Sequence, residues 1–379
     1  MTQNKERIFL SPPHLGDEEL RQVTEAFAIN YIAPIGPHLE RFEADFCAYT
    51  GIAHAVALSS GTAAMHLALR ELDVQPGDDV LVSTLTFIGG VSPITFVGAN
   101  PVFIDSETSS WNMDPALVEE AVREGENKGR LPAAVVPTDL YGHCADLDAL
   151  QAICKPRGIP VIVDSAEALG AQYKGAHAGK GAAASVYSFN GNKIITTGGG
   201  GMLASDDPEL IRHARHLSTQ AREPEPWYEH VEIGYNYRLS NINAAIGIGQ
   251  LQVLEERIRR KREIFDRYVA GLGEIPGIHF MAEAPSERCN RWLSVMQLDP
   301  DITGTNPDVI RRALEAENIE SRPLWKPMHL QPVFADARRY GGSVAESFFT
   351  CGLCLPSGTR LTNDQIDVIC DIVRIALNQ

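Results

Sequence analysis

Seven short apolar runs recur between about residues 54 and 205. Each is rich in Val, Ile, Ala and Leu and lacks the alternation of apolar and polar residues that marks a strand with one solvated face. Such runs are typical of strands that are covered on both faces, as in a mostly parallel sheet. The predicted strands are His54–Leu58, Asp79–Ser83, Pro101–Ile104, Ala133–Pro137, Pro160–Val163, Ala184–Tyr187 and Gly201–Ala204.

Helical patterns separate several of these runs. They cover Thr62–Leu72, Pro115–Glu124 after the N-cap residue Asp114, and Asp146–Cys154. Strands that alternate with helices predict an α/β fold, here a large domain built on a mostly parallel seven-stranded sheet.

The second half of the chain has a different pattern. An apolar stripe from Asn241 to Tyr268 predicts one long helix, and we interpret the basic run Arg257–Arg262 as its solvated face. The pattern beyond it predicts a strand, a helix and a terminal amphipathic helix at Trp292–Leu298, Asn306–Glu317 and Asn363–Leu377. We therefore expect a large domain at residues 1–265 and a small α+β domain at residues 266–379.

Composition narrows the class of protein. Of the 379 residues, 44% are hydrophobic and 22% are charged, so we expect the whole chain to be ordered and globular. The net charge of −16 repels phosphate backbones and anionic membranes, which argues against nucleic-acid and membrane partners. The start lacks the apolar core of a signal peptide, and no later stretch has the length of a membrane span, so we expect a cytoplasmic protein.

Cysteine usage agrees with a reducing compartment, because the seven cysteines are irregularly spaced and suggest no disulfide framework. Cys351 and Cys354 form a C-x-x-C pair, but no second pair completes a zinc site. We expect both to be buried thiols.

Ligands of an open α/β sheet collect where the carboxyl ends of the strands meet loops and helix N-termini. The first predicted strand runs into Ser59–Thr62, which contains Gly61, and then turns helical. Small residues let backbone N–H groups close on an anion, so this segment is a candidate phosphate cup, although it would also serve as an ordinary N-cap. Phe87 follows the second predicted strand, where its ring could stack on a flat heterocycle or belong to the core.

The fifth predicted strand runs directly into a carboxylate, Asp164, and Glu167 lies three residues further on. A buried carboxylate is costly unless a cation or a strong donor pairs with it. A metal ion is one such partner, but no His or Cys lies nearby at ligand spacing, so a protonated ring nitrogen fits better.

The sixth predicted strand leads into SFNGNK, which ends at Lys193, and then into the glycines Gly198–Gly201. A lysine in a tight polar loop beside a buried carboxylate is placed for Schiff-base chemistry, whereas most loop lysines are merely solvated. The glycines match neither the dinucleotide-binding G-x-G-x-x-G nor the P-loop pattern. An anion cup, an aromatic ring, an acid and an amine in this order suit the phosphate, ring, ring nitrogen and aldehyde of pyridoxal phosphate (PLP).

Several longer segments carry a family resemblance that runs from Leu10 to Cys354. Their sequences are NYIAPIG (Asn30–Gly36), SSGTAAMHLAL (Ser59–Leu69), DSAEALGA (Asp164–Ala171), SFNGNKIITTGGGG (Ser188–Gly201), STQARE (Ser218–Glu223), GYNYRLSN (Gly234–Asn241) and RPLWKPMH (Arg322–His329). In these segments the chain resembles the sugar aminotransferases of PLP fold type I.

The resemblance implies a role for each site residue. Lys193 would bind the cofactor's aldehyde and shuttle protons, while Asp164 would pair with the pyridine nitrogen. Glu167 would sit near the ring's phenolic oxygen, and Phe87 would stack on the ring. The family forms homodimers with shared active sites, so the phosphate would be held by Gly61, Thr62, Ser188 and the partner subunit's Asn236.

The resemblance also bears on the substrate. Lysine at position 193 favours transamination, because the family members that deoxygenate sugars with a pyridoxamine cofactor carry histidine there. The segments are most similar to enzymes that use glutamate to aminate C4 of UDP-4-keto-6-deoxy-N-acetylglucosamine on the way to bacillosamine-type sugars. One departure is Gly89-Gly90, where bulkier or hydroxyl residues are usual.

A nucleotide sugar brings a diphosphate, so we expect a locally basic pocket despite the acidic chain. The candidates are Arg238, Arg291, Arg322, Lys326 and His329. The alternative for each is a charge paired with one of the many carboxylates. Two other functions stay open, a PLP-dependent sugar dehydratase and a non-catalytic PLP-binding sensor.

Overall fold

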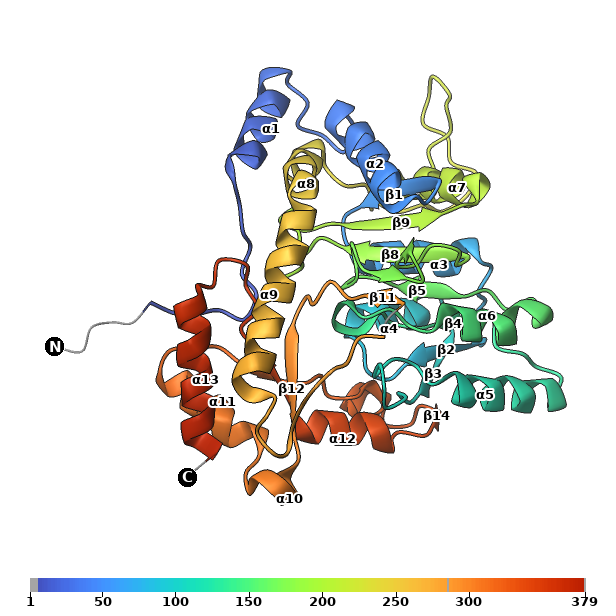
Figure 1. The fold of residues 1–379 in the computed structure, drawn as a ribbon. Helices are drawn as coiled ribbons and strands as arrows, with labels where there is room; N and C mark the ends of the chain where they lie inside the picture. The colour runs from blue at the N-terminus through green and yellow to red at the C-terminus, as the bar shows by residue number, and fades with distance from the viewer. Residues whose placement is uncertain (1–5, 285, 378–379) are drawn as a thin grey trace.

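One twisted sheet forms the centre of the molecule (Figure 1). The computed structural model describes residues 6–284 and 286–377. From one edge to the other the strands are β1 (His54–Leu58), β9 (Gly201–Ser205), β8 (Ala184–Ser188), β5 (Ile162–Asp164), β4 (Ala134–Val136), β2 (Asp79–Ser83), β3 (Asn100–Ile104) and β14 (Arg339–Tyr340). Only β9 runs against its neighbours, so the predicted, mostly parallel α/β sheet is confirmed. Among the described residues it has eight strands rather than the predicted seven, because β14 from the C-terminal part pairs with β3.

Helices cover both faces of this sheet, as its doubly apolar strands require. On one face, the side chains of β1, β8 and β2 share a core with α3 (Gly61–Glu71), α4 (Ile88–Phe96) and α7 (Pro208–Ser218). The opposite face is covered at the β1 end by α2 (Pro37–Thr50) and α8 (Asn241–Gln252), and at the β3 end by α5 (Pro115–Asn127) and α6 (Leu147–Cys154). Helix α1 (Asp17–Ala28) packs on α8.

The C-terminal part has its own antiparallel sheet, in the order β10 (Ile278–Phe280), β12 (Ser294–Leu298), β15 (Gly352–Leu355) and β13 (Arg322–Pro323). The remaining elements are α9 (Leu254–Leu272), α10 (Pro300–Thr303), α11 (Pro307–Ala316), α12 (Ser343–Cys351), α13 (Asn363–Leu377) and a small sheet of β6 (Gln172–Tyr173), β7 (Ala176–His177) and β11 (Glu287–Arg288). Helix α9 runs through the boundary proposed between residues 265 and 266, and β14 returns to the large sheet. The two proposed domains therefore share a helix and a sheet edge.

The expectation of one continuous helix from Asn241 to Tyr268 is wrong. The helix breaks at Val253, which has φ −104° and ψ 5°. The break separates two packing tasks, because α8 lies against α1 and α2, whereas α9 lies against α13 in the C-terminal part.

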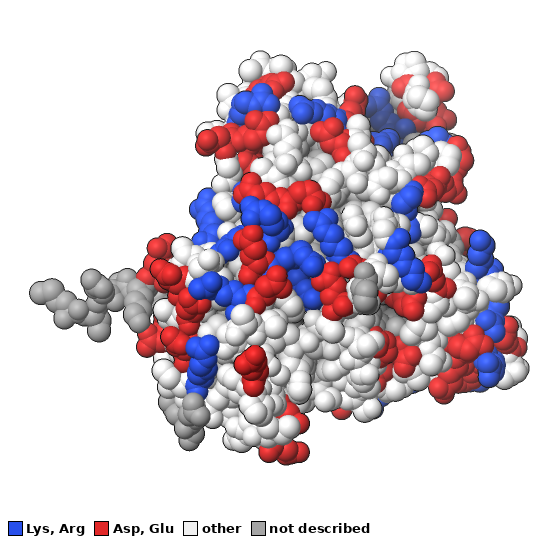
Figure 2. All heavy atoms as spheres, viewed as in Figure 1, with Lys and Arg blue, Asp and Glu red and all other residues white. Residues whose placement is uncertain are grey.

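The basic run on α9 is only partly solvated. Figure 2 shows Lys and Arg side chains mixed with acidic ones on this face of the molecule, and Arg259 pairs there with Glu263. In contrast, Lys261 is 3% exposed and Arg257 is also buried. The solvated-face interpretation is therefore wrong for these two side chains, because Lys261 falls on the apolar stripe that contains Ile258 and Tyr268.

The C-x-x-C pair does not form a disulfide. Cys351 ends α12 and is half-buried, whereas Cys354 is buried in β15, and both are free thiols. Among the helices of the described residues, none is long and apolar enough to span a membrane.

Candidate active site

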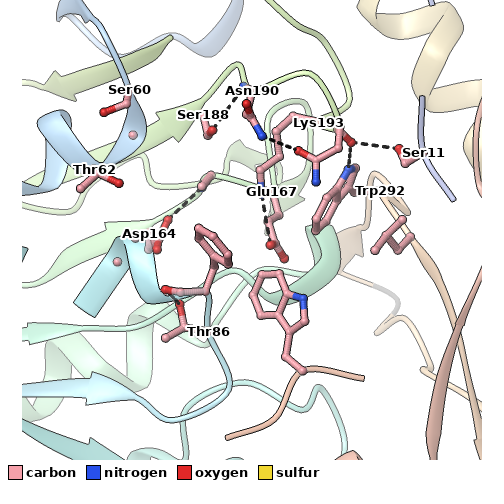
Figure 3. Close-up of a pocket in the computed structure, with 18 of the residues that line it drawn as sticks. Ser11, Ser60, Thr62, Thr86, Asp164, Glu167, Ser188, Asn190, Lys193 and Trp292 are labelled. Atoms are coloured by element: carbon pink, nitrogen blue, oxygen red, sulfur yellow. Dashed lines mark hydrogen bonds and ion pairs between the residues drawn. The ribbon is translucent and has the colours of Figure 1, made fainter. Parts of the chain in front are cut away.

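The carboxyl ends of β1, β2, β5 and β8 open into a cavity of about 800 Å³ (Figure 3). This volume lies in the range of small-molecule sites. The N-terminal segment at Leu10–Pro13 and the C-terminal part, including Trp292, supply the opposite wall. Eight of the residues singled out in the sequence line the cavity, namely Gly61, Thr62, Phe87, Asp164, Glu167, Ser188, Lys193 and Arg322.

The N-terminus of α3 forms one end of the cavity. Ser60 is its N-cap, and its hydroxyl accepts a hydrogen bond from the Ala63 N–H at 3.0 Å. An added Cβ at Gly61 would lie 3.4 Å from the Ser188 Cβ, so the end of β8 and the first turn of α3 are in close contact. The backbone N–H groups in the first turn of α3, together with the hydroxyl groups of Thr62 and Ser188, could hold a phosphate.

Asp164 ends β5 with its carboxylate at the cavity and is 6% exposed. Its Oδ1 accepts a hydrogen bond from the Ala166 N–H at 3.1 Å. Burial raises the pKa of this carboxyl group, and the nearby Lys193 charge counteracts that shift only in part. Within the described residues no cationic side chain forms an ion pair with Asp164.

Glu167 and Lys193 form a buried ion pair, with 3.3 Å between Oε1 and Nζ. The other carboxylate oxygen of Glu167 accepts the Tyr141 N–H at 2.7 Å. Tyr141 adopts φ 53° to present that N–H, a strained conformation for a bulky residue. Burial raises the pKa of Glu167 to about 7, while Lys193 and Tyr141 favour its charged form. This carboxyl group is therefore poised to hold or release a proton near neutrality.

Aromatic rings line the cavity, and one of them contacts the amine. The Lys193 Nζ lies 4.0 Å from the centroid of the Trp292 ring, a cation–π distance. The Phe87 ring is 60% exposed and faces Trp325 at 6.0 Å between centroids. A flat heterocycle could enter between these rings and the sheet.

The cavity omits five of the singled-out residues. Arg238 is buried against Glu43 and the Ala57 carbonyl, and burial lowers its pKa. Asn236 is exposed and follows an exposed apolar segment. For Arg238, the expectation of substrate contact in the chain's own pocket is wrong. Its guanidinium is desolvated and needs the Glu43 carboxylate as its partner, so it is not available to a substrate phosphate in this pocket.

The same correction applies to the three other basic candidates that the cavity omits. Arg291 bonds the Met281 carbonyl at 2.9 Å and stacks on Phe265. His329 lies between the Thr84 hydroxyl, at 2.6 Å, and Glu346, at 3.0 Å. Lys326 is exposed outside the cavity, because the chain after Trp325 turns to follow the end of β2. Of the five basic candidates, the cavity retains Arg322.

Sequence reasoning missed Trp292, Trp325 and Tyr141 as parts of the site. Trp325 lies inside the RPLWKPMH segment, and Trp292 follows Arg291, so both were close to residues that we did single out. Tyr141 gave no signal, because its contribution is a backbone N–H.

The sequence of residues 13–374 matches the DegT/DnrJ/EryC1/StrS aminotransferase family. The chain belongs to this family.

Individual relatives agree with the match to the DegT/DnrJ/EryC1/StrS family. A protein of Bacillus subtilis (strain 168), named as the pyridoxal phosphate-dependent aminotransferase EpsN, is 49% identical over 364 residues, which cover 95% of this chain and 93% of that protein. The GDP-perosamine synthase of Escherichia coli O157:H7 is 35% identical over 362 residues, covering 95% of this chain and 96% of that protein. The solved PLP form of the sugar aminotransferase Spr1654 from Streptococcus pneumoniae has a TM-score of 0.89 and 27% identity, covering 98% of this chain and 99% of that chain. This member of the family is therefore a PLP-dependent aminotransferase with the type I fold.

The cavity of this DegT-family chain fits PLP on the evidence of its own atoms. The buried Asp164 carboxylate lacks a cationic partner among the described residues, and a protonated pyridine nitrogen would supply one. The Gly89-Gly90 departure has a steric reason in the same place. An added Cβ at Gly90 would lie 2.5 Å from Asp164 Oδ2, and one at Gly89 would lie 2.9 Å from the Thr62 hydroxyl. Glycine at these positions lets α4 approach the site closely.

We expect Gly90→Ala to weaken PLP binding, because the new methyl group must displace the Asp164 carboxylate or shift α4. The Kd for PLP should rise about tenfold, which corresponds to ~1.4 kcal/mol. Titration of the apoprotein with PLP, followed by absorbance, measures this change. Gly191→Ala is the matched control, since an added Cβ there meets nothing closer than 4.0 Å. An unchanged Kd in Gly90→Ala would contradict the close packing of α4 on Asp164.

Proposed function

We propose that this enzyme transfers an amino group from glutamate to C4 of a nucleotide-linked 4-keto-6-deoxy sugar, for a surface polysaccharide or glycan. The substrate that the sequence resemblance favours is UDP-4-keto-6-deoxy-N-acetylglucosamine. The observation that carries the proposal is the Lys193 amine, which lies against Glu167 in a cavity of about 800 Å³ that is large enough for a sugar. The name of the GDP-perosamine synthase relative supports a nucleotide-linked substrate.

Different residues at the cavity would bind different parts of the cofactor. The N-terminus of α3, with Gly61, Thr62 and Ser188, would hold the phosphate. Asp164 would hold the ring nitrogen in its protonated form, and Phe87 would stack on the ring. When bound, PLP supplies an electron sink for bonds that break at the amino-bearing carbon.

Lys193 and Glu167 would handle protons beside that ring. The Lys193 amine would take a proton from the amino-bearing carbon of glutamate and would deliver a proton to the sugar carbon that receives the amino group. Glu167, whose pKa is about 7, would accept or return a proton as the charge of the Lys193 amine changes. Trp292 covers the amine at 4.0 Å and excludes water from one side.

The outer part of the cavity would hold the nucleotide. Arg322 lies at its edge with a side chain that is 67% exposed, and Glu320 pairs with it at 2.8 Å. A guanidinium that is held by one carboxylate can still present donors to a phosphate. The exposed ring of Phe9 lines the same region, where it could stack on a base.

A homodimer with shared sites is also part of the proposal. Asn236 is exposed, and the segment before it exposes apolar side chains at Trp227, Tyr228, Val231 and Ile233. A cluster of this kind is typical of a surface that a partner covers. The seven free cysteines, five of them buried, support a reducing compartment such as the cytoplasm.

A product assay tests the proposed reaction. Purified holoenzyme is incubated with glutamate and a panel of nucleotide-linked 4-keto sugars, and the products are identified by mass spectrometry and NMR. An amino sugar from UDP-4-keto-6-deoxy-N-acetylglucosamine, formed with loss of glutamate, is the expected result. Amination of a different sugar only would overturn the substrate, and loss of a sugar hydroxyl without amination would support a dehydratase instead.

We expect Lys193→Ala to lower transamination by at least about a thousandfold, because it removes both the amine and the proton carrier. Circular dichroism should show an unchanged fold, since the side chain leaves no sealed core cavity. Substantial turnover in this variant would exclude Lys193 from the chemistry.

We expect Arg322→Ala to raise the KM for the nucleotide sugar about tenfold, the effect of losing a hydrogen bond to a charged group. The half-reaction with glutamate should stay nearly unchanged. Arg312→Ala, which alters a 75% exposed arginine on α11, is the control. Loss of both half-reactions together would place Arg322 at the cofactor or in the fold.

We expect mixed dimers to recover activity that neither parent has. Lys193→Ala chains are combined with Asn236→Ala chains, and each mixed dimer should contain one complete site if Asn236 completes the site of its partner. The recovered turnover is measured after the mixed dimers are isolated by differential tags. Isolated mixed dimers without activity would show that each chain builds its own site.

A further inference from the structure

Lys261 is the most deeply buried cation of α9. Its side chain is 3% exposed, and its ammonium group faces three neutral oxygens. They are the Trp292 carbonyl at 2.8 Å, the Ser357 carbonyl at 2.9 Å and the Ser11 hydroxyl at 3.4 Å. No carboxylate of the described residues forms an ion pair with it, and burial lowers its pKa to about 7. A buried cation without a counter-ion lowers the stability of the fold, so we asked what the three hydrogen bonds of Lys261 contribute to the protein.

The three oxygens belong to three separate segments that meet at the cavity. Trp292 lies just before β12, Ser357 follows β15, and Ser11 lies in the N-terminal segment that lines the cavity. These segments are also tied to one another, because Ser357 donates its N–H to the Leu10 carbonyl and accepts the Ser294 N–H at its hydroxyl. The Lys261 ammonium group therefore donates hydrogen bonds to all three segments and joins them at one point.

Two of these segments act on the residue before Lys193. The Asn192 carbonyl accepts one hydrogen bond from the Ser11 hydroxyl at 2.9 Å and another from the Trp292 indole N–H at 2.7 Å (Figure 3). The Trp292 ring also covers the Lys193 amine at 4.0 Å. A displacement of Trp292 or Ser11 would therefore move the peptide that carries Lys193 and the ring above its amine.

We propose that Lys261 is a positioning residue for Lys193, acting through Trp292 and Ser11 on the Asn192 carbonyl. The proposal rests on the proposed function in taking Lys193 as the residue that binds PLP. An apolar side chain of similar length would suit the packing of α9 equally well, since Ile258, Phe265 and Tyr268 share its stripe. The ammonium group is what the two carbonyls and the hydroxyl require, and no other cation of the described residues bonds to any of these three atoms.

The test compares Lys261→Met with Arg259→Met, which changes an exposed side chain of the same helix. Two measurements report the placement of Lys193 without turnover. The first is the rate at which the apoprotein captures PLP. The second is the pH midpoint of the absorbance change of bound PLP, which depends on the environment of the Lys193 nitrogen.

In Lys261→Met, we expect PLP capture to slow about tenfold and the pH midpoint to move by about half a unit or more. Arg259→Met should match the wild type in both. If Lys261→Met only lowers the melting temperature and leaves both measurements unchanged, its role is structural and the proposal is overturned.

A second pair of variants decides the question if Lys261→Met does not fold. Ser11→Ala and Trp292→Phe each remove one donor to the Asn192 carbonyl and keep Lys261 in place. Combined, they should shift the same midpoint, and an unchanged midpoint would overturn the relay. Failure of the sugar assay with a normal PLP spectrum would count against the proposed reaction alone. If the absorbance spectrum of bound PLP is the same in Lys193→Ala as in the wild type, Lys193 does not bind PLP, and both the proposed reaction and the role of Lys261 are overturned.

Discussion

The Asp164 carboxylate at the end of β5 is costly to bury, and the architecture of the site follows from keeping it there. Burying an isolated charge costs several kcal/mol, and among the described residues the Ala166 N–H is the one donor that bonds to this carboxylate. A protonated ring nitrogen within hydrogen-bonding reach of the carboxylate would offset that cost. The close approach of α4, which the glycine at position 90 permits, forms the wall of the cavity beside this carboxylate.

Much of the fold could be predicted from the sequence because burial on both faces leaves a clear mark. The runs at β1 and β2 contain no inward or outward alternation, and their bounds agree with the structure to the residue. Asp164 and Lys193 could also be identified from the sequence, because an acid or an amine in or just after the end of a buried strand stands out chemically. The match to the DegT/DnrJ/EryC1/StrS family over residues 13–374 agrees with the resemblance to sugar aminotransferases that these residues indicated.

The parts that sequence reasoning missed depend on partners far away in the chain. Arg238 and His329 looked like anion ligands, yet Glu43 and Glu346 already occupy them, and spacing along the chain carries no sign of those pairs. Lys261 looked solvated because its neighbours in the basic run are charged. Its helical position, three residues after Ile258 and seven before Tyr268, places it on the buried stripe of α9.

The N-terminal segment has a consequence for how the protein is made. Its Leu10 carbonyl bonds to the Ser357 N–H, and its Ile8 backbone bonds to Asn318 and Glu320, so these contacts can form only after residues 318–357 have been synthesised. On the ribosome, the central sheet can form while these partners are still being synthesised, since domains fold in the order in which they emerge. The wall of the cavity closes only when the chain is almost complete. A nascent chain would then carry a formed sheet with an open, apolar pocket mouth, the stage at which chaperones would be expected to engage it.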